Sequence, residues 1–323
     1  MRGAGEPKRS SRHLVDPELL PVLEALPLFD LSMESLPAMR ATRASIGAGE
    51  MTFSGLHFER RTVQSPDGAQ VRVNLFRPEG AARVGPAILH IHGGGYVLGT
   101  ADMTNATNAA TALKLDCVIV SVDYRLAPET PFPGPLHDCY AALRWLHACA
   151  PELGVDPKRI AIAGESAGAG IAAGLALLAR DRGDAPICFQ CLVYPMLDDR
   201  TTAENTSPYS GEFVWNAKSN HFGWSAYLGR APGAADIPSY AAPARATDLA
   251  GLPPAFINCG ALDLFADEDI AYARRLMHAG VATELHIYPG AFHGFPLAPG
   301  THLAAVAERD RIDALRRAFE EIQ

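Results

Sequence analysis

RIAIAGESAG, residues 159–168, joins a short apolar run to a helix-length segment of small residues. The apolar run predicts a strand buried on both faces, and Ser166 falls where this strand would turn into the following helix. So sharp a turn crowds the backbone around the serine, which explains why the residues two positions away, Gly164 and Gly168, are small. The turn would lift the Ser166 hydroxyl clear of the sheet.

Similar apolar runs recur before and after this stretch, with helix-length segments between them. They are PAILHIH (86–92), CVIVSV (117–122), ICFQCLVY (187–194), PAFINCG (254–260) and TELHIYP (283–289). Because the runs are continuous rather than alternating, they predict strands that are buried on both faces. Helices are expected at 136–149 and 169–182 among others. This alternation predicts an α/β fold with a mainly parallel, doubly wound sheet.

Two alternating runs precede this pattern, LHFERRTV (56–63) and AQVRVNLF (69–76). The turn-forming sequence SPDG (65–68) lies between them. Alternation on both sides of such a turn is typical of an antiparallel hairpin. We expect this hairpin at one edge of the sheet.

Two further segments depart from the strand–helix rhythm and are predicted to form a helical cap. In the segment 1–50, Asp16 and Pro17 are typical of a helix start, and a glycine-rich break at 46–50 follows. The segment 198–243 is rich in Asn, Ser, Gly, Pro and aromatic residues and is too long for an ordinary crossover loop. The catalytic domain would then be 51–323, with 198–243 as a cap insertion.

Composition limits the possible partners and locations. The 323 residues suffice for one large α/β domain with insertions or for two small domains. The 28 Lys and Arg against 36 Asp and Glu give a net charge of −8. This charge argues against a nucleic-acid partner, since the basic cluster Lys8, Arg9 and Arg12 is only a short tail. No membrane-spanning run and no secretory signal are visible, which predicts a cytoplasmic protein.

The six cysteines fit a reducing compartment, where thiols pack as small apolar groups. Cys188 and Cys191 have the spacing of a CxxC motif. A strand would point them to opposite faces, and no second pair completes a zinc site. We therefore expect a structural role for both and no metal.

The context of Ser166, between a buried strand and a helix, predicts a catalytic nucleophile. The backbone N–H of Ala167 would point into the same site, and the dipole of the following helix would favour negative charge there. The alternative is a glycine-rich helix start selected only for close packing.

Three glycines follow His92 at the end of another predicted strand: Gly93, Gly94 and Gly95. Glycines leave backbone N–H groups free to face a developing oxyanion, so Gly93 and Gly94 are predicted donors together with Ala167. Alternatives are a flexible turn or a phosphate-binding loop, but the downstream spacing does not fit a dinucleotide motif. His92 is expected to anchor the loop rather than to act as a base.

Four sequence blocks resemble one known family: HGGGY (92–96), DYRLAPE (123–129), GESAG (164–168) and HGF (293–295). In this order they resemble the hormone-sensitive-lipase-like esterases, the bacterial family IV carboxylesterases. The resemblance implies an α/β-hydrolase fold, a cap formed by the N-terminus and an insertion, and no metal or organic cofactor. It also implies activity on short acyl esters and a homodimer through the sheet edge.

His293 is the predicted general base, because a serine hydroxyl is a weak nucleophile until its proton is removed. It follows the last predicted strand, where a loop at the carboxyl end of the sheet can reach Ser166, and the family's histidine has the same HGF context. His90 and His286 lie within strands and are expected to be core or edge residues.

Asp263 is the predicted third member of the triad, since it follows a strand and keeps the chain order Ser, Asp, His. This sequence has leucine where the family usually has proline after the aspartate. Asp267 is the second candidate, although it is expected to cap the following helix. Asp198 and Asp199 are further alternatives.

Other residues are predicted with less direct roles. Glu165 either hydrogen-bonds neighbouring loops or is a tolerated polar residue. Arg125 and Glu129 are expected to pair and to hold the turn after their strand.

The aromatic residues Tyr209, Phe213, Trp215 and Trp224 suggest an apolar substrate pocket under the cap, or else they pack the cap onto the domain. The first three are the predicted pocket residues.

The function predicted from these residues is a serine carboxylesterase acting on small-molecule esters with short to medium acyl chains through an acyl-enzyme. An amidase, deacetylase or lactone hydrolase would use the same triad. A non-catalytic small-molecule receptor is the alternative of another class, but plant hormone receptors that resemble this family lack the catalytic histidine, which is present here.

Overall fold

The computed structural model describes residues 10–25, 30–44, 46, 52–80, 84–202, 206–298 and 300–320. Lys8 and Arg9 of the basic cluster and residues 47–50 of the glycine-rich break lie outside these ranges.

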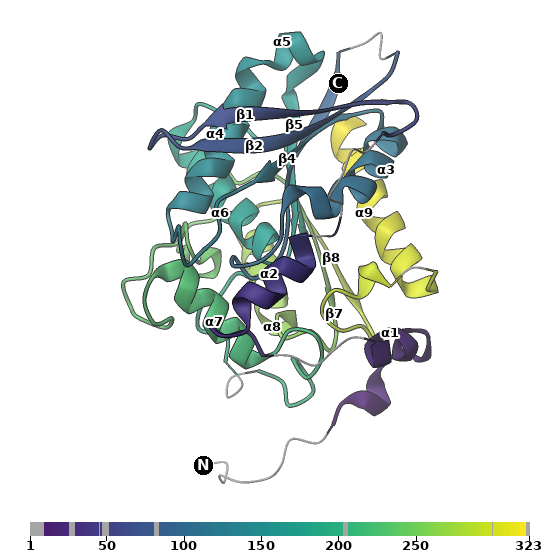
Figure 1. Ribbon diagram of the computed structural model, residues 1–323, viewed down its shortest axis with the longest axis vertical. Helices are drawn as coiled ribbons and strands as arrows, with labels where there is room; N and C mark the ends of the chain where they lie inside the picture. Colours follow the sequence, from purple (N-terminus) through teal and green to yellow (C-terminus); the bar gives the residue numbers. More distant parts are fainter. Residues whose placement is uncertain are drawn as a thin grey trace.

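One sheet of eight strands forms the centre of the molecule, in the order β1-β2-β4-β3-β5-β6-β7-β8 (Figure 1). The strands are β1 (Leu56–Gln64), β2 (Gln70–Pro78), β3 (Gly85–Ile91), β4 (Val118–Asp123), β5 (Val155–Glu165), β6 (Phe189–Val193), β7 (Ala255–Gly260) and β8 (Thr283–Tyr288). Every neighbouring pair from β4 to β8 is parallel, whereas β1 pairs antiparallel with β2 and β2 with β4. The predicted fold class, with its edge hairpin, is confirmed.

Helices cover both faces of this sheet. On one face α3 (Asn105–Leu115) packs beside α9 (His302–Glu320), whose start is capped by Thr301. On the other face α4 (Gly134–Ala148) packs beside α6 (Ala167–Arg182), and α8 (Ala266–His278) covers β7 and β8 (Figure 1). The short α5 (Ala150–Leu153) precedes β5. Strands buried under helices on both faces explain the continuous apolar runs in the sequence.

The two segments that interrupt the strand–helix alternation contact each other. The N-terminal segment carries α1 (Leu20–Ala25) and α2 (Leu36–Ala44), and the insertion carries α7 (Ala217–Leu228). The N–H of Leu31 donates to Ser219 Oγ at 3.1 Å, and Lys218 pairs with Asp30 at 3.0 Å. Figure 1 shows α1, α2 and α7 at the end of the molecule away from α5.

Helix α3 was not expected from the sequence. Its buried side includes the polar residues Asn105, Asn108 and Thr111, so it lacks the apolar periodicity of an ordinary packed helix. These residues find partners on neighbouring elements: Asn105 accepts from Asn74 of β2 at 2.9 Å, and Thr111 accepts from Arg311 of α9 at 2.9 Å. Side-chain hydrogen bonds therefore satisfy this buried face.

The predicted pairing of Arg125 with Glu129 is wrong. Arg125 binds the carboxylate of Asp138 with an Nη2–Oδ1 distance of 2.7 Å, because that carboxylate is fully buried and requires a cation. Glu129 is more exposed and pairs with Arg40 of α2 at 2.7 Å. The turn after β4 is thus tied to α4 through Arg125 and to the N-terminal segment through Glu129.

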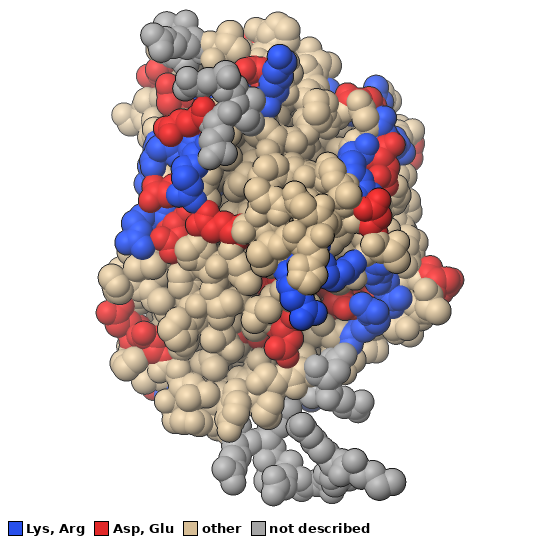
Figure 2. Space-filling model, turned by 180° about the vertical axis from the view of Figure 1, so that it is seen from behind, with Lys and Arg blue, Asp and Glu red and all other residues tan. Residues whose placement is uncertain are grey.

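Charges of both signs are mixed on the surface that Figure 2 shows, where Lys and Arg alternate with Asp and Glu. None of the helices in the described part of the chain has both the length and the apolar composition needed to span a bilayer.

Candidate active site

Ser166 lies between the end of β5 and the start of α6, at a φ of 55°. Positive φ is uncommon for a residue with a side chain, and here the neighbouring strand and loop hold it in place. The N–H of Ser166 donates to the carbonyl of Val193 at 2.9 Å, and its own carbonyl accepts from Met196 at 3.1 Å. The sequence prediction of a sharp strand-to-helix turn is therefore confirmed.

The glycines on either side of this turn have no room for a side chain. A Cβ on Gly164 would lie 2.7 Å from the carbonyl oxygen of Ile91, and one on Gly168 would lie 2.1 Å from the same oxygen. Since Ile91 ends β3, this contact sets the close approach of α6 to the neighbouring strand. Small residues are needed here for packing as well as for the turn.

Ser166, His293 and Asp263 meet at the carboxyl end of the sheet, although they come from three separate loops. His293 Nε2 lies 3.0 Å from Ser166 Oγ, and His293 Nδ1 lies 2.8 Å from Asp263 Oδ2. All three side chains are buried. The imidazole ring lies between aromatic neighbours, with ring centroids 4.8 Å from Tyr194 and 5.2 Å from Phe265. Such a series can pass a proton from the hydroxyl to the imidazole while the carboxylate orients the ring.

The loop that carries Asp263 is anchored although it has Leu264 where the family usually has proline. The N–H of Asp263 donates to Gly260 at 3.1 Å, and Asp263 Oδ1 accepts from the N–H of Phe265 at 3.0 Å. The side chain of Leu264 is buried and contacts the loop at Gly211. Hydrogen bonds and packing thus restrain this turn.

The other candidates for the acid of the triad lie away from His293. Asp267 is in the first turn of α8 rather than at its cap, and its carboxylate accepts from Ser207 at 3.2 Å. Asp199 pairs with Arg245 at 2.5 Å, and Asp198 pairs with Arg200 at 2.7 Å. None of these three carboxylates contacts His293.

The glycine loop after β3 lies beside Ser166. A Cβ on Gly93 would be 2.8 Å from the carbonyl of Glu165 and 3.4 Å from Ser166 Cβ. Gly94 and Gly95 both have positive φ, and a Cβ on Gly95 would clash with the Trp215 ring at 2.2 Å. Within the described ranges no acceptor takes the N–H of Gly93, Gly94 or Ala167. These three amides are therefore available to a bound group.

His92 is buried and forms contacts within the loop. Its Nδ1 lies 2.9 Å from the carbonyl oxygen of Gly93, and its ring stacks on Tyr124 with centroids 4.3 Å apart. Burial lowers the pKa of the imidazole, so a neutral ring would donate its Nδ1 proton to that carbonyl. The expected anchoring role agrees with these contacts.

Glu165 bonds to a neighbouring strand rather than to a loop. Its carboxylate lies 3.1 Å from His90 Nε2, and His90 is buried in β3 as expected for a core residue. Burial raises the pKa of the Glu165 carboxyl, but the charge and hydrogen bond of His90 outweigh this effect and bring the pKa below its ordinary value.

A cavity of about 550 Å³ opens onto Ser166 and His293. Of the three aromatic residues predicted to line it, only Trp215 does. The prediction is wrong for the other two: Phe213 is buried against Phe292, and Tyr209 is exposed beside His13 at the surface. Trp224 is fully buried against Tyr96 and Tyr227 instead.

The cavity wall also contains residues that the sequence analysis did not identify. They include Arg43, Leu98, Met103, Thr107, Tyr194 and Arg311. Tyr194 directly follows β6, so its position at the carboxyl end of a strand was a usable signal. The others come from helices and loops whose packing onto the sheet has no sequence signature.

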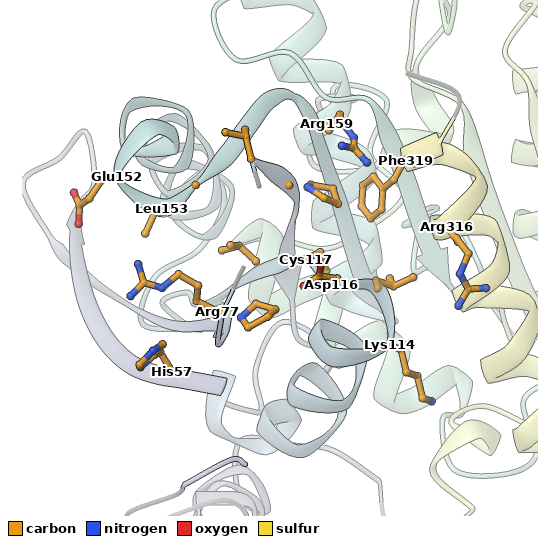
Figure 3. A pocket seen from close by; sticks show the side chains of 18 of the residues that line it. His57, Arg77, Lys114, Asp116, Cys117, Glu152, Leu153, Arg159, Arg316 and Phe319 are labelled. Carbon is orange, nitrogen blue, oxygen red and sulfur yellow. The ribbon is translucent and has the colours of Figure 1, made fainter. Parts of the chain in front are cut away.

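A second cavity, of about 660 Å³, lies at the opposite, amino ends of the strands (Figure 3). Arg77, Asp116, Arg159 and Phe319 line it. None of the predicted site residues belongs to this cavity.

Asp269, in the first turn of α8, is fully buried, and no N–H or O–H group in the described chain donates to its oxygens. The thiol of Cys259 beside it is only a weak donor. Burial, together with the charges of Glu268 and Asp263, raises the pKa of the Asp269 carboxyl well above its ordinary value.

The raised pKa predicts a pH effect on stability. Above about pH 4 the unfolded chain loses this proton while the native chain keeps it, so stability falls as pH rises, by up to about 1.4 kcal/mol per pH unit. In Asp269→Asn this contribution is absent. The difference in Tm between variant and wild type should therefore become more positive from pH 5 to pH 9 in thermal melts. Asp267→Asn is the exposed control, and equal pH profiles for wild type and Asp269→Asn would contradict the prediction.

Comparison with known proteins gives a consistent result. The model of a family described as alpha/beta hydrolase fold matches residues 88–297. Carboxylesterase NlhH of Mycobacterium tuberculosis (strain ATCC 25618 / H37Rv) is 36% identical over 315 residues, which cover 94% of this chain and 96% of that protein. Esterase LipI of the same strain is 36% identical over 307 residues, 92% of each.

Solved structures of esterases are also similar. A bacterial heroin esterase superposes with a TM-score of 0.89 at 41% identity, covering 96% of this chain and 99% of that one. The esterase LipW from Mycobacterium marinum has a TM-score of 0.85 at 37% identity, with coverage of 95% and 97%.

Proposed function

This chain belongs to the alpha/beta hydrolase fold family and is a carboxylic-ester hydrolase, and on that premise we propose that Ser166, His293 and Asp263 form its catalytic triad. The observation that carries the proposal is the continuous series of contacts from Asp263 Oδ2 through the imidazole to Ser166 Oγ, at 2.8 and 3.0 Å. The position of Ser166 at a strained turn, where its hydroxyl faces the cavity, supports the same roles.

In the first stage Ser166 Oγ attacks the carbonyl carbon of the ester as His293 Nε2 takes the hydroxyl proton. Asp263 remains ionised and stabilises the imidazolium that forms. His293 then gives the proton to the leaving alcohol, which leaves an acyl-enzyme. In the second stage His293 removes a proton from water, the hydroxide attacks the acyl carbon, and the acid is released as Ser166 recovers its proton.

The oxyanion of both tetrahedral intermediates would accept hydrogen bonds from the free N–H groups of Gly93, Gly94 and Ala167. His92 acts here as a positioning residue. In a planar trans peptide the N–H of Gly94 points away from the carbonyl of Gly93. Because the His92 ring binds that carbonyl at 2.9 Å, it would hold this peptide in the orientation that directs the Gly94 N–H toward the oxyanion.

The cap would shape the substrate site, since both of its segments contribute to the cavity wall. Arg43 comes from α2, and Val214 and Trp215 come from the insertion. The acyl and alcohol groups of the substrate must fit together into a cavity of about 550 Å³, and this volume favours small esters with short to medium acyl chains. A cytoplasmic location and a homodimer stay predictions from the sequence and from the family resemblance.

Two measurements test this function. With p-nitrophenyl esters from acetate to palmitate, kcat/KM should peak at short acyl chains and fall once the chain outgrows the cavity. A fluorophosphonate should inactivate the enzyme with a stoichiometry of one, and peptide mapping should place the phosphonyl group on Ser166.

Other outcomes would redirect or overturn the proposal. Rates that keep rising to palmitate would contradict the proposed acyl range. Turnover of butyryl p-nitroanilide but of no p-nitrophenyl ester would identify an amidase. A folded protein that hydrolyses neither compound and is not labelled at Ser166 would refute the triad.

A further inference from the structure

Arg43 is a charged residue in the wall of the active-site cavity that has no partner among the described residues. It lies at the end of α2 and is half-buried. In the part of the chain that the structure describes, no carboxylate, hydroxyl or carbonyl oxygen accepts a hydrogen bond from its guanidinium. Burial lowers the pKa of this group, yet a guanidinium stays protonated at neutral pH. Among the described residues, the positive charge of Arg43 therefore has no direct partner.

The two carboxylates that line the same cavity are already paired with other residues. Glu165 contacts His90 at 3.1 Å. Glu308 pairs with Arg311 at 2.8 Å and with Lys114 at 3.1 Å. Neither carboxylate forms an ion pair with Arg43. Buried or partly buried charges are normally paired, and since the described residues supply no partner for Arg43, we look to a bound ligand for it.

The helix that carries Arg43 is firmly attached beside the glycine loop. Arg40, one turn earlier, donates to the carbonyl oxygens of Val97 and Ala127 at 2.8 and 2.7 Å. It also binds both carboxylate oxygens of Glu129, at 2.7 and 2.9 Å. Residues three apart on a helix lie on the same side, so these bonds fix the position from which Arg43 reaches the cavity.

We propose that Arg43 binds a carboxylate group carried by the substrate, so that the enzyme prefers esters with one free carboxylate to neutral esters of the same shape. The inference rests on the proposed function, because the same cavity must hold the scissile ester at Ser166. A guanidinium matches a carboxylate in charge and in its paired hydrogen bonds. A monoanion suits this wall better than a phosphate dianion, since Glu165 and Glu308 also line it.

The test compares half-esters with neutral esters in which a methyl ketone replaces the carboxylate. On the acyl side, monoethyl succinate, glutarate and adipate are compared with ethyl 4-oxopentanoate, 5-oxohexanoate and 6-oxoheptanoate. On the alcohol side, 4-acetoxybutanoate is compared with 5-acetoxypentan-2-one. Rates are measured by pH-stat for wild type, Arg43→Met and Arg43→Lys.

In Arg43→Met, the ratio of kcat/KM for the carboxylate ester to that for its ketone partner should fall about tenfold to a hundredfold for at least one pair. Most of the loss should lie in KM, because the contact is present in both ground and transition states. Arg43→Lys should retain part of the preference. In the wild type, the preference should weaken as salt is raised.

The inference is overturned if wild type and Arg43→Met have the same ratio for every pair while both hydrolyse the neutral esters. A wild-type preference that does not respond to salt would also count against it. If the wild type hydrolyses no ester at all in a Ser166-dependent manner, the proposed function fails and this inference fails with it.

Discussion

Ser166→Ala is expected to lower kcat for p-nitrophenyl butyrate about a millionfold, the effect seen when a triad nucleophile is removed. The methyl group cannot attack the carbonyl, and water is not positioned to replace the hydroxyl. Binding in the cavity does not depend on Ser166 Oγ, so KM should change little. Alanine tolerates the φ of 55° about as well as serine, and the Tm should stay within a few degrees of wild type.

After so large a loss, the residual activity of the variant must be distinguished from the activity of contaminating wild-type enzyme. Residual activity that a fluorophosphonate abolishes belongs to contaminating enzyme, whereas activity that resists it belongs to the variant. A resistant rate within a hundredfold of wild type, in a protein with an unchanged Tm, would show that Ser166 is not the nucleophile.

The parts of the site that could be predicted are those where a short motif coincides with the end of a strand. HGGG follows β3, GESAG spans the end of β5 and the start of α6, and HGF follows β8. A parallel sheet brings the carboxyl ends of its strands to one edge, so chain order alone places these motifs near one another. Once they lie close together, the hydroxyl of Ser166, the imidazole of His293 and the carboxylate of Asp263 are the groups expected to form hydrogen bonds with one another.

Side chains that depend on packing between distant segments could not be predicted. Arg125 bonds to Asp138 rather than to Glu129 because burial of the Asp138 carboxylate decides the pairing, and burial cannot be read from spacing within DYRLAPE. In the insertion, Phe213 and Trp215 are both buried, and only the structure shows that Trp215 lines the cavity whereas Phe213 packs against Phe292.

Helix α3 was missed for a related reason. Its buried side carries Asn105, Asn108 and Thr111, which suit the sheet only because Asn74, His90 and Arg311 supply hydrogen bonds. Hydrophobic periodicity detects helices that pack through apolar contacts. A helix that packs through side-chain hydrogen bonds gives no such signal.

Asp263→Asn is expected to lower kcat about ten-thousandfold, because it should lock His293 in the wrong tautomer. The two oxygens of Asp263 have different partners: Oδ1 accepts from the N–H of Phe265 at 3.0 Å, and Oδ2 accepts from His293 Nδ1 at 2.8 Å. An asparagine has one oxygen, and the backbone N–H of Phe265 can only donate. The amide nitrogen would then face His293 Nδ1, which must accept, so the proton moves to Nε2. A protonated Nε2 cannot take the proton of Ser166.

Matched variants separate this tautomer effect from simple loss of charge. Asp267→Asn removes the charge of a nearby acid that does not touch His293, and it should change kcat by less than about threefold. Asp263→Ala leaves Nδ1 without a donor facing it, so both tautomers are accessible and its kcat should be no lower than that of Asp263→Asn. A loss of less than tenfold in Asp263→Asn, together with a large loss in Asp267→Asn, would assign the orienting role to Asp267. If kcat of Asp263→Ala is instead far lower than that of Asp263→Asn, the asparagine still orients the imidazole ring correctly. The negative charge of Asp263 would then matter more than the tautomer that it selects.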